Sequence, residues 1–172
     1  MKHILPILTI TTLAAAASAQ SAAAPAGLSY NRVGLGYNSE SKGYTLTASA
    51  LIGSSNFLVE ADTTIGGGNT LGNGSDSVSL GYVFKNVALG ADATVSVGSN
   101  ESYGLNVRKD LGNNIEVAAS YGRELNAAGT DHATVWGVEL AYNVSKQIQV
   151  AVGYSDASKA ASTTDISVRY NF

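Results

Sequence analysis

The sequence predicts an all-β fold: a transmembrane antiparallel up-and-down β-barrel of about ten strands, with eight strands as the alternative. Three observations support this fold class. Apolar and polar residues alternate over runs of roughly 8 to 12 residues, the period of a strand with one face in lipid and one in water. Clusters of Gly, Asn, Ser and Asp separate the runs, as turns require. No stretch after residue 19 keeps a helical period.

Ten runs alternate in this way, and most have the roughly 9 to 11 residues that a tilted strand needs to cross a bilayer. The first run is the least regular, because Tyr30 and Tyr37 fall on opposite faces, so a bulge or an uncertain start is expected there. An eight-stranded barrel would turn two of the runs into long loops. The runs cover residues 28–37, 43–53, 57–66, 76–85, 87–98, 101–111, 115–125, 133–144, 148–156 and 164–172.

An even number of strands places both ends of a single-chain barrel on the same side of the membrane, and the connections then alternate between the two sides. Short turns are expected on the periplasmic side, at 53–56, 85–86, 111–114 and 144–147. The outer loops are expected at 38–42, 67–75, 99–100, 126–132 and 157–163, and several of them are longer. Short periplasmic turns and longer outer loops are typical of such barrels.

The first residues have the pattern of a secretory signal peptide. Lys2 and His3 precede an apolar stretch over residues 4–16, and small residues at 17–19 allow cleavage before Gln20. We therefore expect residues 1–19 to be a signal peptide and residues 20–172 to be one barrel domain; the alternative is a buried N-terminal helix. Cleavage removes Lys2, so nine basic residues remain against 13 acidic ones, a net charge of −4.

Composition excludes several classes of function. The chain has no cysteine, which leaves no disulfide framework, thiolate metal site or thiol nucleophile. A weakly charged, mildly acidic protein is a poor partner for nucleic acid. A secreted chain without disulfides needs another source of stability, and a closed barrel in lipid supplies one because every backbone group is paired.

The last strand alternates apolar residues up to a terminal Phe172, with Tyr170 and Val168 before it. This ending resembles the C-terminal strand of bacterial outer-membrane proteins, which the barrel-assembly machinery reads. With the signal peptide and the strand pattern, the mature chain resembles the superfamily of small outer-membrane β-barrel proteins (OmpX-type, opacity-type and porin-like). The resemblance implies the outer membrane of a Gram-negative bacterium, with membrane lipid and lipopolysaccharide as partners.

Aromatic side chains on the lipid-facing positions sort towards the two ends of the strands. Amphipathic rings prefer membrane interfaces, so two girdles are expected. The outer girdle comprises Tyr37, Tyr44, Tyr103, Tyr121, Trp136 and Tyr154. The inner girdle and assembly signal comprise Phe57, Phe84, Tyr142, Tyr170 and Phe172.

The alternation also places charged residues inside the barrel, with eight acids against three bases. Buried charges need partners, so one interpretation is a solid plug of ion pairs, hydrogen bonds and waters. The other is a narrow water-filled path whose acidic excess favours cations. The lumen-lining charges are Arg32, Glu60, Asp62, Asp92, Arg108, Glu116, Glu139 and Arg169, with Asp110, Glu124 and Asp165 on the same faces.

Catalytic chemistry has little support. His132 is the only histidine after the predicted cleavage site, and it follows Asp131 in a predicted loop with Glu124 nearby in sequence. Residues 72–78 resemble one copy of a calcium-binding repeat that works only as an array. The glycine run at 66–68 lacks the Lys and Ser/Thr of a phosphate loop. We assign no catalytic, cofactor-binding or metal-binding residue and expect no cofactor.

Three functions remain, because this fold hosts many activities. The first is a non-enzymatic outer-membrane barrel with a structural or surface-interaction role. The second is a narrow, weakly cation-preferring porin for small solutes. The third, a distant alternative, is an outer-membrane hydrolase or acyltransferase. Expected partners are lipid, lipopolysaccharide, the barrel-assembly machinery, and small solutes or a surface ligand; nucleic acid is not expected.

Overall fold

A computed structural model describes residues 28–39, 42–66, 76–125, 131–158 and 161–172. The predicted signal peptide at 1–19, the predicted loop at 67–75 and most of the predicted loop at 126–132 lie outside these residues. Within the described ranges, no helix is long and apolar enough to cross a bilayer.

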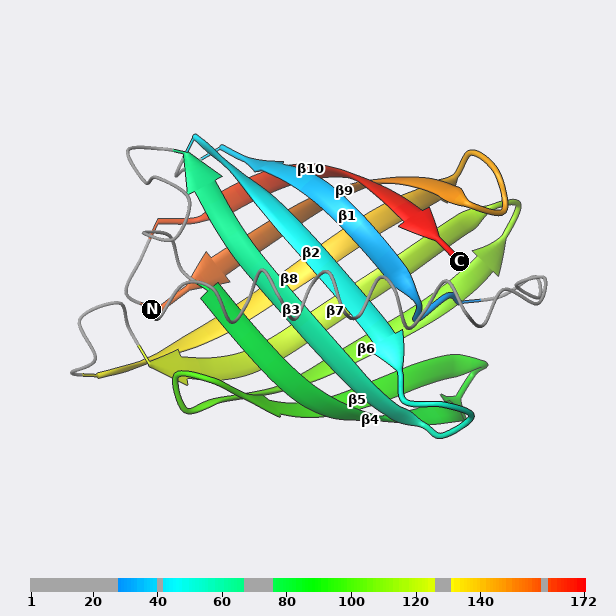
Figure 1. Cartoon of the computed structure of the whole chain (residues 1–172), viewed down its shortest axis with the longest axis horizontal. Helices are drawn as coiled ribbons and strands as arrows, with labels where there is room; N and C mark the ends of the chain where they lie inside the picture. Colours follow the sequence, from blue (N-terminus) through cyan, green and yellow to red (C-terminus); the bar gives the residue numbers. More distant parts are fainter. Residues whose placement is uncertain (1–27, 40–41, 67–75, 126–130, 159–160) are drawn as a thin grey trace.

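The described residues form ten strands in one closed barrel (Figure 1). Every strand pairs antiparallel with its neighbours in the chain, and β1 closes the ring against β10. The predicted all-β up-and-down barrel of ten strands is therefore confirmed over this part of the chain, in preference to eight. The strands are β1 (Arg32–Asn38), β2 (Gly43–Leu51), β3 (Phe57–Gly66), β4 (Asp76–Ala88), β5 (Ala91–Gly98), β6 (Ser102–Gly112), β7 (Ile115–Leu125), β8 (His132–Asn143), β9 (Ile148–Ala157) and β10 (Thr163–Asn171).

The two faces of the barrel follow the alternation in the sequence. On β9, for example, the outward Val150, Val152 and Tyr154 are exposed, whereas the inward Gln149 and Ala151 are buried. Large exposed apolar side chains of this kind occur on the outward face of every strand, and they surround the barrel. The molecule therefore has an apolar outside and a polar inside, the reverse of a soluble domain.

The barrel has two distinguishable ends. At the end that we call the terminal end, β1 begins at Arg32 and β10 stops at Asn171, and the connections at 52–56, 89–90, 113–114 and 144–147 are short. At the opposite end, which we call the loop end, β1 stops at Asn38, β3 at Gly66, β5 at Gly98, β7 at Leu125 and β9 at Ala157. The asymmetry in connection length expected from the sequence is present.

One predicted turn was wrong. The Lys85-Asn86 pair, expected to join the fourth and fifth strands, lies within β4, which has a bulge between Phe84 and Ala88. Asn86 adopts a positive φ of 54° there, and its backbone N–H donates to Asp92 Oδ1 at 2.9 Å. The chain turns at Leu89 and Gly90 instead, with φ values of 51° and 74°. Asparagine suits the left-handed conformation both in a turn and in a bulge, so its presence did not distinguish them.

The first strand starts later than the run in the sequence. Pairing of β1 with β10 begins at Arg32, opposite Asn171, so residues 28–31 precede the sheet. The conflict between Tyr30 and Tyr37 arises because only Tyr37 points outwards. Tyr30 is buried inside the barrel, with 6% of its surface exposed.

The aromatic residues predicted for the outer girdle lie on the outward face with 41% to 62% of their surface exposed, in the halves of their strands nearer the loop end. Those predicted for the inner girdle lie nearer the terminal end. Edge-on contacts join ring pairs at both levels: Tyr37 with Tyr44 at 5.5 Å, and Phe57 with Tyr82 at 5.2 Å. Tyr82 was not included in either predicted girdle.

Candidate functional site in the barrel interior

The segment at residues 28–31 crosses the terminal end of the barrel interior and is held there from several strands. The Ser49 hydroxyl on β2 donates to the Tyr30 carbonyl at 2.8 Å, and the Leu51 N–H donates to the Asn31 side-chain carbonyl at 2.9 Å. Arg108 on β6 donates from Nη1 to the Ser29 carbonyl at 3.0 Å. These bonds join the segment to opposite walls, and we call residues 28–31 the terminal plug.

The Tyr30 ring fills the space beneath this segment. It packs against Leu58 on β3 and Val83 on β4, which are 3% and 0% exposed, while the Arg108 guanidinium carbon lies 4.8 Å from the ring centre. The phenol donates to Asp92 Oδ2 at 2.8 Å. Burial, with the hydrogen bond to Asp92, raises the pKa of the Tyr30 phenol, so the hydroxyl keeps its proton and remains a donor.

A buried polar network lies beside the plug. Arg108 donates from Nε to Glu116 Oε1 on β7 at 2.7 Å, and both side chains are at most 5% exposed. Gln149 on β9 donates from Nε2 to Glu116 Oε2 at 3.2 Å and to Asn143 Oδ1 at 3.0 Å. Each oxygen of the buried Glu116 carboxylate therefore accepts a hydrogen bond, as a buried charge requires.

A second ion pair extends the network across the interior. Arg169 on β10 donates from Nη1 to Glu139 Oε1 on β8 at 2.6 Å, and its Nη2 pairs with Glu139 Oε2. This two-point geometry is the strong form of an arginine–carboxylate contact. Arg169 Nη1 also donates to Gln149 Oε1 at 3.3 Å, which connects the two pairs.

The other predicted lumen charges have different environments. Asp92 accepts from Tyr30 and from the Asn86 backbone, and Asp62 accepts from the Ser77 hydroxyl. Glu60 is partly buried and lines a cavity. Asp110 and Glu124, at opposite ends of the barrel, are exposed.

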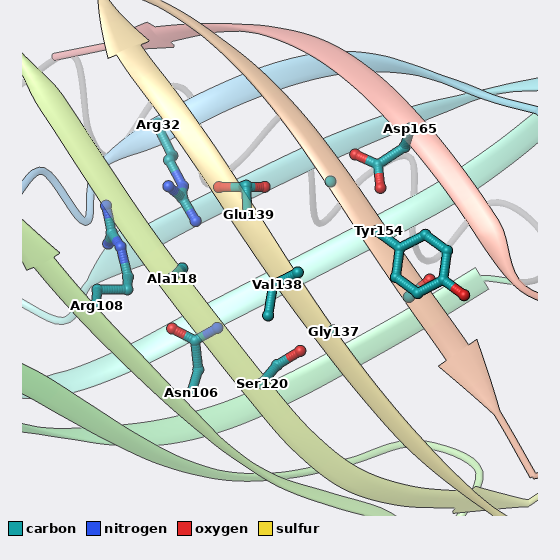
Figure 2. A pocket seen from close by; sticks show the side chains of 12 residues that line it. Arg32, Asn106, Arg108, Ala118, Ser120, Gly137, Val138, Glu139, Tyr154 and Asp165 are labelled. Carbon is teal, nitrogen blue, oxygen red and sulfur yellow. The ribbon is translucent and has the colours of Figure 1, made fainter.

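Two cavities occupy the interior next to these groups. The larger has a volume of about 150 Å³ and is bounded by β1 and by β6 to β10 (Figure 2). The smaller, of about 70 Å³, lies towards β2 to β6 and is bounded by Tyr30 and Leu58. Arg32, Asn106 and Arg108 line both cavities and therefore separate them.

Arg32 differs from the other two interior arginines. Its guanidinium points between Arg108 and Glu139 (Figure 2), and its Nη1 is buried without a hydrogen-bond partner. Two neutral atoms, Ser167 Oγ and Asn171 Oδ1, share this condition, so Arg32 contributes the one charged atom of this kind among the described residues. Its acidic neighbours, Glu116 and Glu139, are already paired with other arginines.

Asp165 on β10 lines the larger cavity. It lies four residues before Arg169, on the same face of the strand. Its carboxylate lies over Gly153 of β9, where an added Cβ would come within 2.5 Å of Oδ1. The bare glycine backbone thus makes the space that Asp165 occupies. Among the described residues, the Asp165 side chain makes no hydrogen bond or ion pair, and it is only partly buried.

Sequence reasoning missed several of these contributors. Tyr30 was placed in the first alternating run, at 28–37, where its face conflicts with that of Tyr37, and no interior role was given to it. The neutral Gln149 and Asn106 carried no charge to draw attention. Their inward positions follow from the alternation on β9 and β6, so they could have been identified as polar lumen residues. Which acid meets which arginine depends on the stagger between strands, which the sequence does not state.

The predicted loop histidine has a partner other than the one considered. His132 Nε2 lies 3.3 Å from Oε2 of Glu101, a largely exposed residue of the connection at 99–101. Among the described residues, no group of three His, Cys, Asp or Glu side chains is placed to hold a metal ion.

Comparisons with known proteins give the fold. No family model and no curated protein matches the chain. Among solved structures, a KdgM porin in complex with disordered oligogalacturonate is similar over 82% of this chain and 99% of its own, with 16% identity and a TM-score of 0.50. The outer-membrane protein Omp33 of Acinetobacter baumannii is similar over 85% of this chain and 100% of its own, with 12% identity and a TM-score of 0.36. This chain has the fold of outer-membrane β-barrels.

Proposed function

We propose that this chain is an integral outer-membrane β-barrel of a Gram-negative bacterium that is closed at its periplasmic end and has a structural or surface-binding role, without enzymatic activity. The exposed apolar side chains around the barrel support the membrane location, because soluble monomers rarely expose such large apolar areas. The terminal end is assigned to the periplasm, with lipid and lipopolysaccharide in contact with the outer face.

The packing of the terminal end carries the proposal of a closed barrel. Side chains from opposite walls meet there with almost no exposure: Val83 at 0%, Gln149 at 2%, Glu116 at 3%, Arg108 at 5% and Tyr30 at 6%. A barrel of about eight strands has an interior that side chains can fill, and ten strands add little width. A layer packed in this way leaves no path for hydrated ions.

The test is single-channel conductance of the refolded mature protein in a planar bilayer, with a heat-modifiable gel shift to show that the barrel is folded. The wild type is expected to insert without conducting. Tyr30→Gly, which empties the space beneath the plug, is expected to give discrete current steps. Tyr103→Gly, which removes an outward ring, is the matched control and should stay silent. A folded wild type that conducts, or a silent Tyr30→Gly variant, would contradict the proposal.

A second candidate is a narrow solute channel in which the plug moves aside. The two interior cavities favour it, and the similar KdgM structure, a porin in complex with oligogalacturonate, is compatible with it. The sequence predicted a weak cation preference for such a channel. Conductance that prefers cations in the wild type, and loses that preference in Glu60→Gln or Glu139→Gln, would support this candidate over the closed barrel.

A further inference from the structure

The larger cavity contains two charged groups that the protein leaves available, one of each sign. Arg32 has a buried Nη1 with no acceptor, and Asp165 has a carboxylate outside the network of paired charges. Every other charge lining this cavity belongs to an ion pair, since Arg108 is held by Glu116 and Glu139 by Arg169. The cavity therefore presents one cation and one anion to whatever enters it.

The unpartnered Arg32 nitrogen calls for an acceptor. A buried donor without a hydrogen bond costs free energy, and the cost is greater for a charged group. Arg32 is also repelled by Arg108 and Arg169. A carboxylate in the cavity would relieve both penalties, because it accepts hydrogen bonds and carries the opposite charge. Arginine is the side chain best suited to bind a planar carboxylate.

The acidic residues near the loop end decide against a simple anion. Asp62 lies near enough to Glu60, Asp76 and Glu124 to be repelled by all three. With the terminal end packed, a ligand enters from the loop end and passes these acids. A ligand with net negative charge is disfavoured there, whereas a molecule that also carries an ammonium group is not.

The cavity volume sets the size of the ligand. It is about 150 Å³, and a protein cavity of roughly this volume holds one benzene molecule, which has about six non-hydrogen atoms. Alanine and β-alanine each have about this many atoms. A disaccharide or a peptide is too large for this space.

We propose that the larger cavity is a binding site for a small zwitterion of amino-acid size, with its carboxylate on Arg32 and its ammonium group towards Asp165. Asn106 and Ser120, which also line the cavity, supply further polar contacts (Figure 2). The site goes beyond the proposed closed barrel. It requires the interior cavity and access to that cavity from the loop end. A conducting wild type would overturn the closed barrel without changing the result of a binding measurement.

The experiment is calorimetric titration of the refolded mature protein in a zwitterion-free, nonionic detergent with L-alanine and β-alanine at constant ionic strength. Saturable binding of at least one of them is expected at concentrations up to about 50 mM. Propionate and propylammonium, which each keep one charged group, are expected to bind at least about tenfold more weakly. No saturable binding of either amino acid, or propionate binding as tightly as the better amino acid, would overturn the proposal.

Variants separate the two charges. Arg32→Gln is expected to weaken amino-acid binding by at least about tenfold. Asp165→Asn is expected to remove the preference for the amino acid over propionate. Lys85→Gln and Lys146→Gln change exposed charges outside the cavity lining, and binding should stay within about twofold of the wild type. The gel shift shows that each variant is folded, and Arg32→Lys serves if the glutamine variant does not fold. Unchanged binding in a folded Arg32 variant would refute the site.

Discussion

The two ends of the barrel interior solve the problem of buried charge in different ways. At the terminal end, Arg108, Glu116 and Gln149 satisfy one another and lie under the plug formed by residues 28–31. Towards the loop end, Asp62 and Glu124 are acids near other acids, and Glu124 is exposed. Paired charges in a packed layer stabilise and close a barrel, whereas acids in a wider space leave room for water or a ligand. The difference between these environments can be tested residue by residue.

The largest expected effect is on a buried pair. Arg108→Ala leaves Glu116 charged and buried without its cation, which is expected to reduce the free energy of unfolding by about 3–5 kcal/mol. Glu124→Ala, at the exposed loop end, is the matched comparison and should change it by about 0.5 kcal/mol or less. Equilibrium unfolding of the refolded barrel in urea, followed by Trp136 fluorescence, measures both variants.

A double variant controls this prediction. Replacing both partners, as in Arg108→Met with Glu116→Leu, removes the unpaired charge and should recover most of the loss, because apolar replacements of buried pairs are often neutral or stabilising. Similar losses in Arg108→Ala and Glu124→Ala would show that the two ends do not differ in the way that the structure indicates.

A smaller effect is expected from the phenol of the plug. Tyr30→Phe keeps the ring against Leu58 and Val83 but leaves Asp92 without one of its two donors, and it should cost about 1–3 kcal/mol. Tyr103→Phe, on the exposed outer face, should cost close to nothing. The same urea titration measures both. Equal losses of unfolding free energy in Tyr30→Phe and Tyr103→Phe would mean that Tyr30 stabilises the barrel through its ring and not through its hydroxyl.

The fold was largely predictable because a strand between lipid and water has to alternate, and that period is visible in single residues. The pairing inside was not. Counting charges on the inward faces gave an acidic excess and suggested a cation path, yet Glu116 and Glu139 are taken up by Arg108 and Arg169, and Arg32 is left without a partner. Those pairings depend on strand stagger and on long side chains that reach across the interior, neither of which alternation encodes.

Local backbone geometry explains the other difference between sequence and structure, and it gives a third prediction. Gly90 turns the chain at a φ of 74°, with no atoms near the position of an added Cβ. Gly90→Ala should therefore lose stability through backbone strain alone, by about 1–2 kcal/mol. Lys85 lies in the segment where the sequence predicts the turn, and its φ is not positive. Lys85→Gly therefore relieves no backbone strain and serves as the comparison. A stable Gly90→Ala barrel would argue against the turn at Leu89-Gly90.

The smallest effect is expected at the loop end, for the one histidine that sequence reasoning considered for catalysis. His132 meets Glu101 at 3.3 Å, but Glu101 is 73% exposed, so water and salt screen the pair. Exposed ion pairs typically contribute less than about 1 kcal/mol. His132→Ala should therefore leave unfolding within about 0.5 kcal/mol of the wild type, and Glu101→Ala should behave in the same way. Both variants should also leave amino-acid binding unchanged, because neither residue lines the larger cavity. A large loss in either variant would mean that the loop end is organised by specific contacts, as the terminal end is, and would remove the contrast between them.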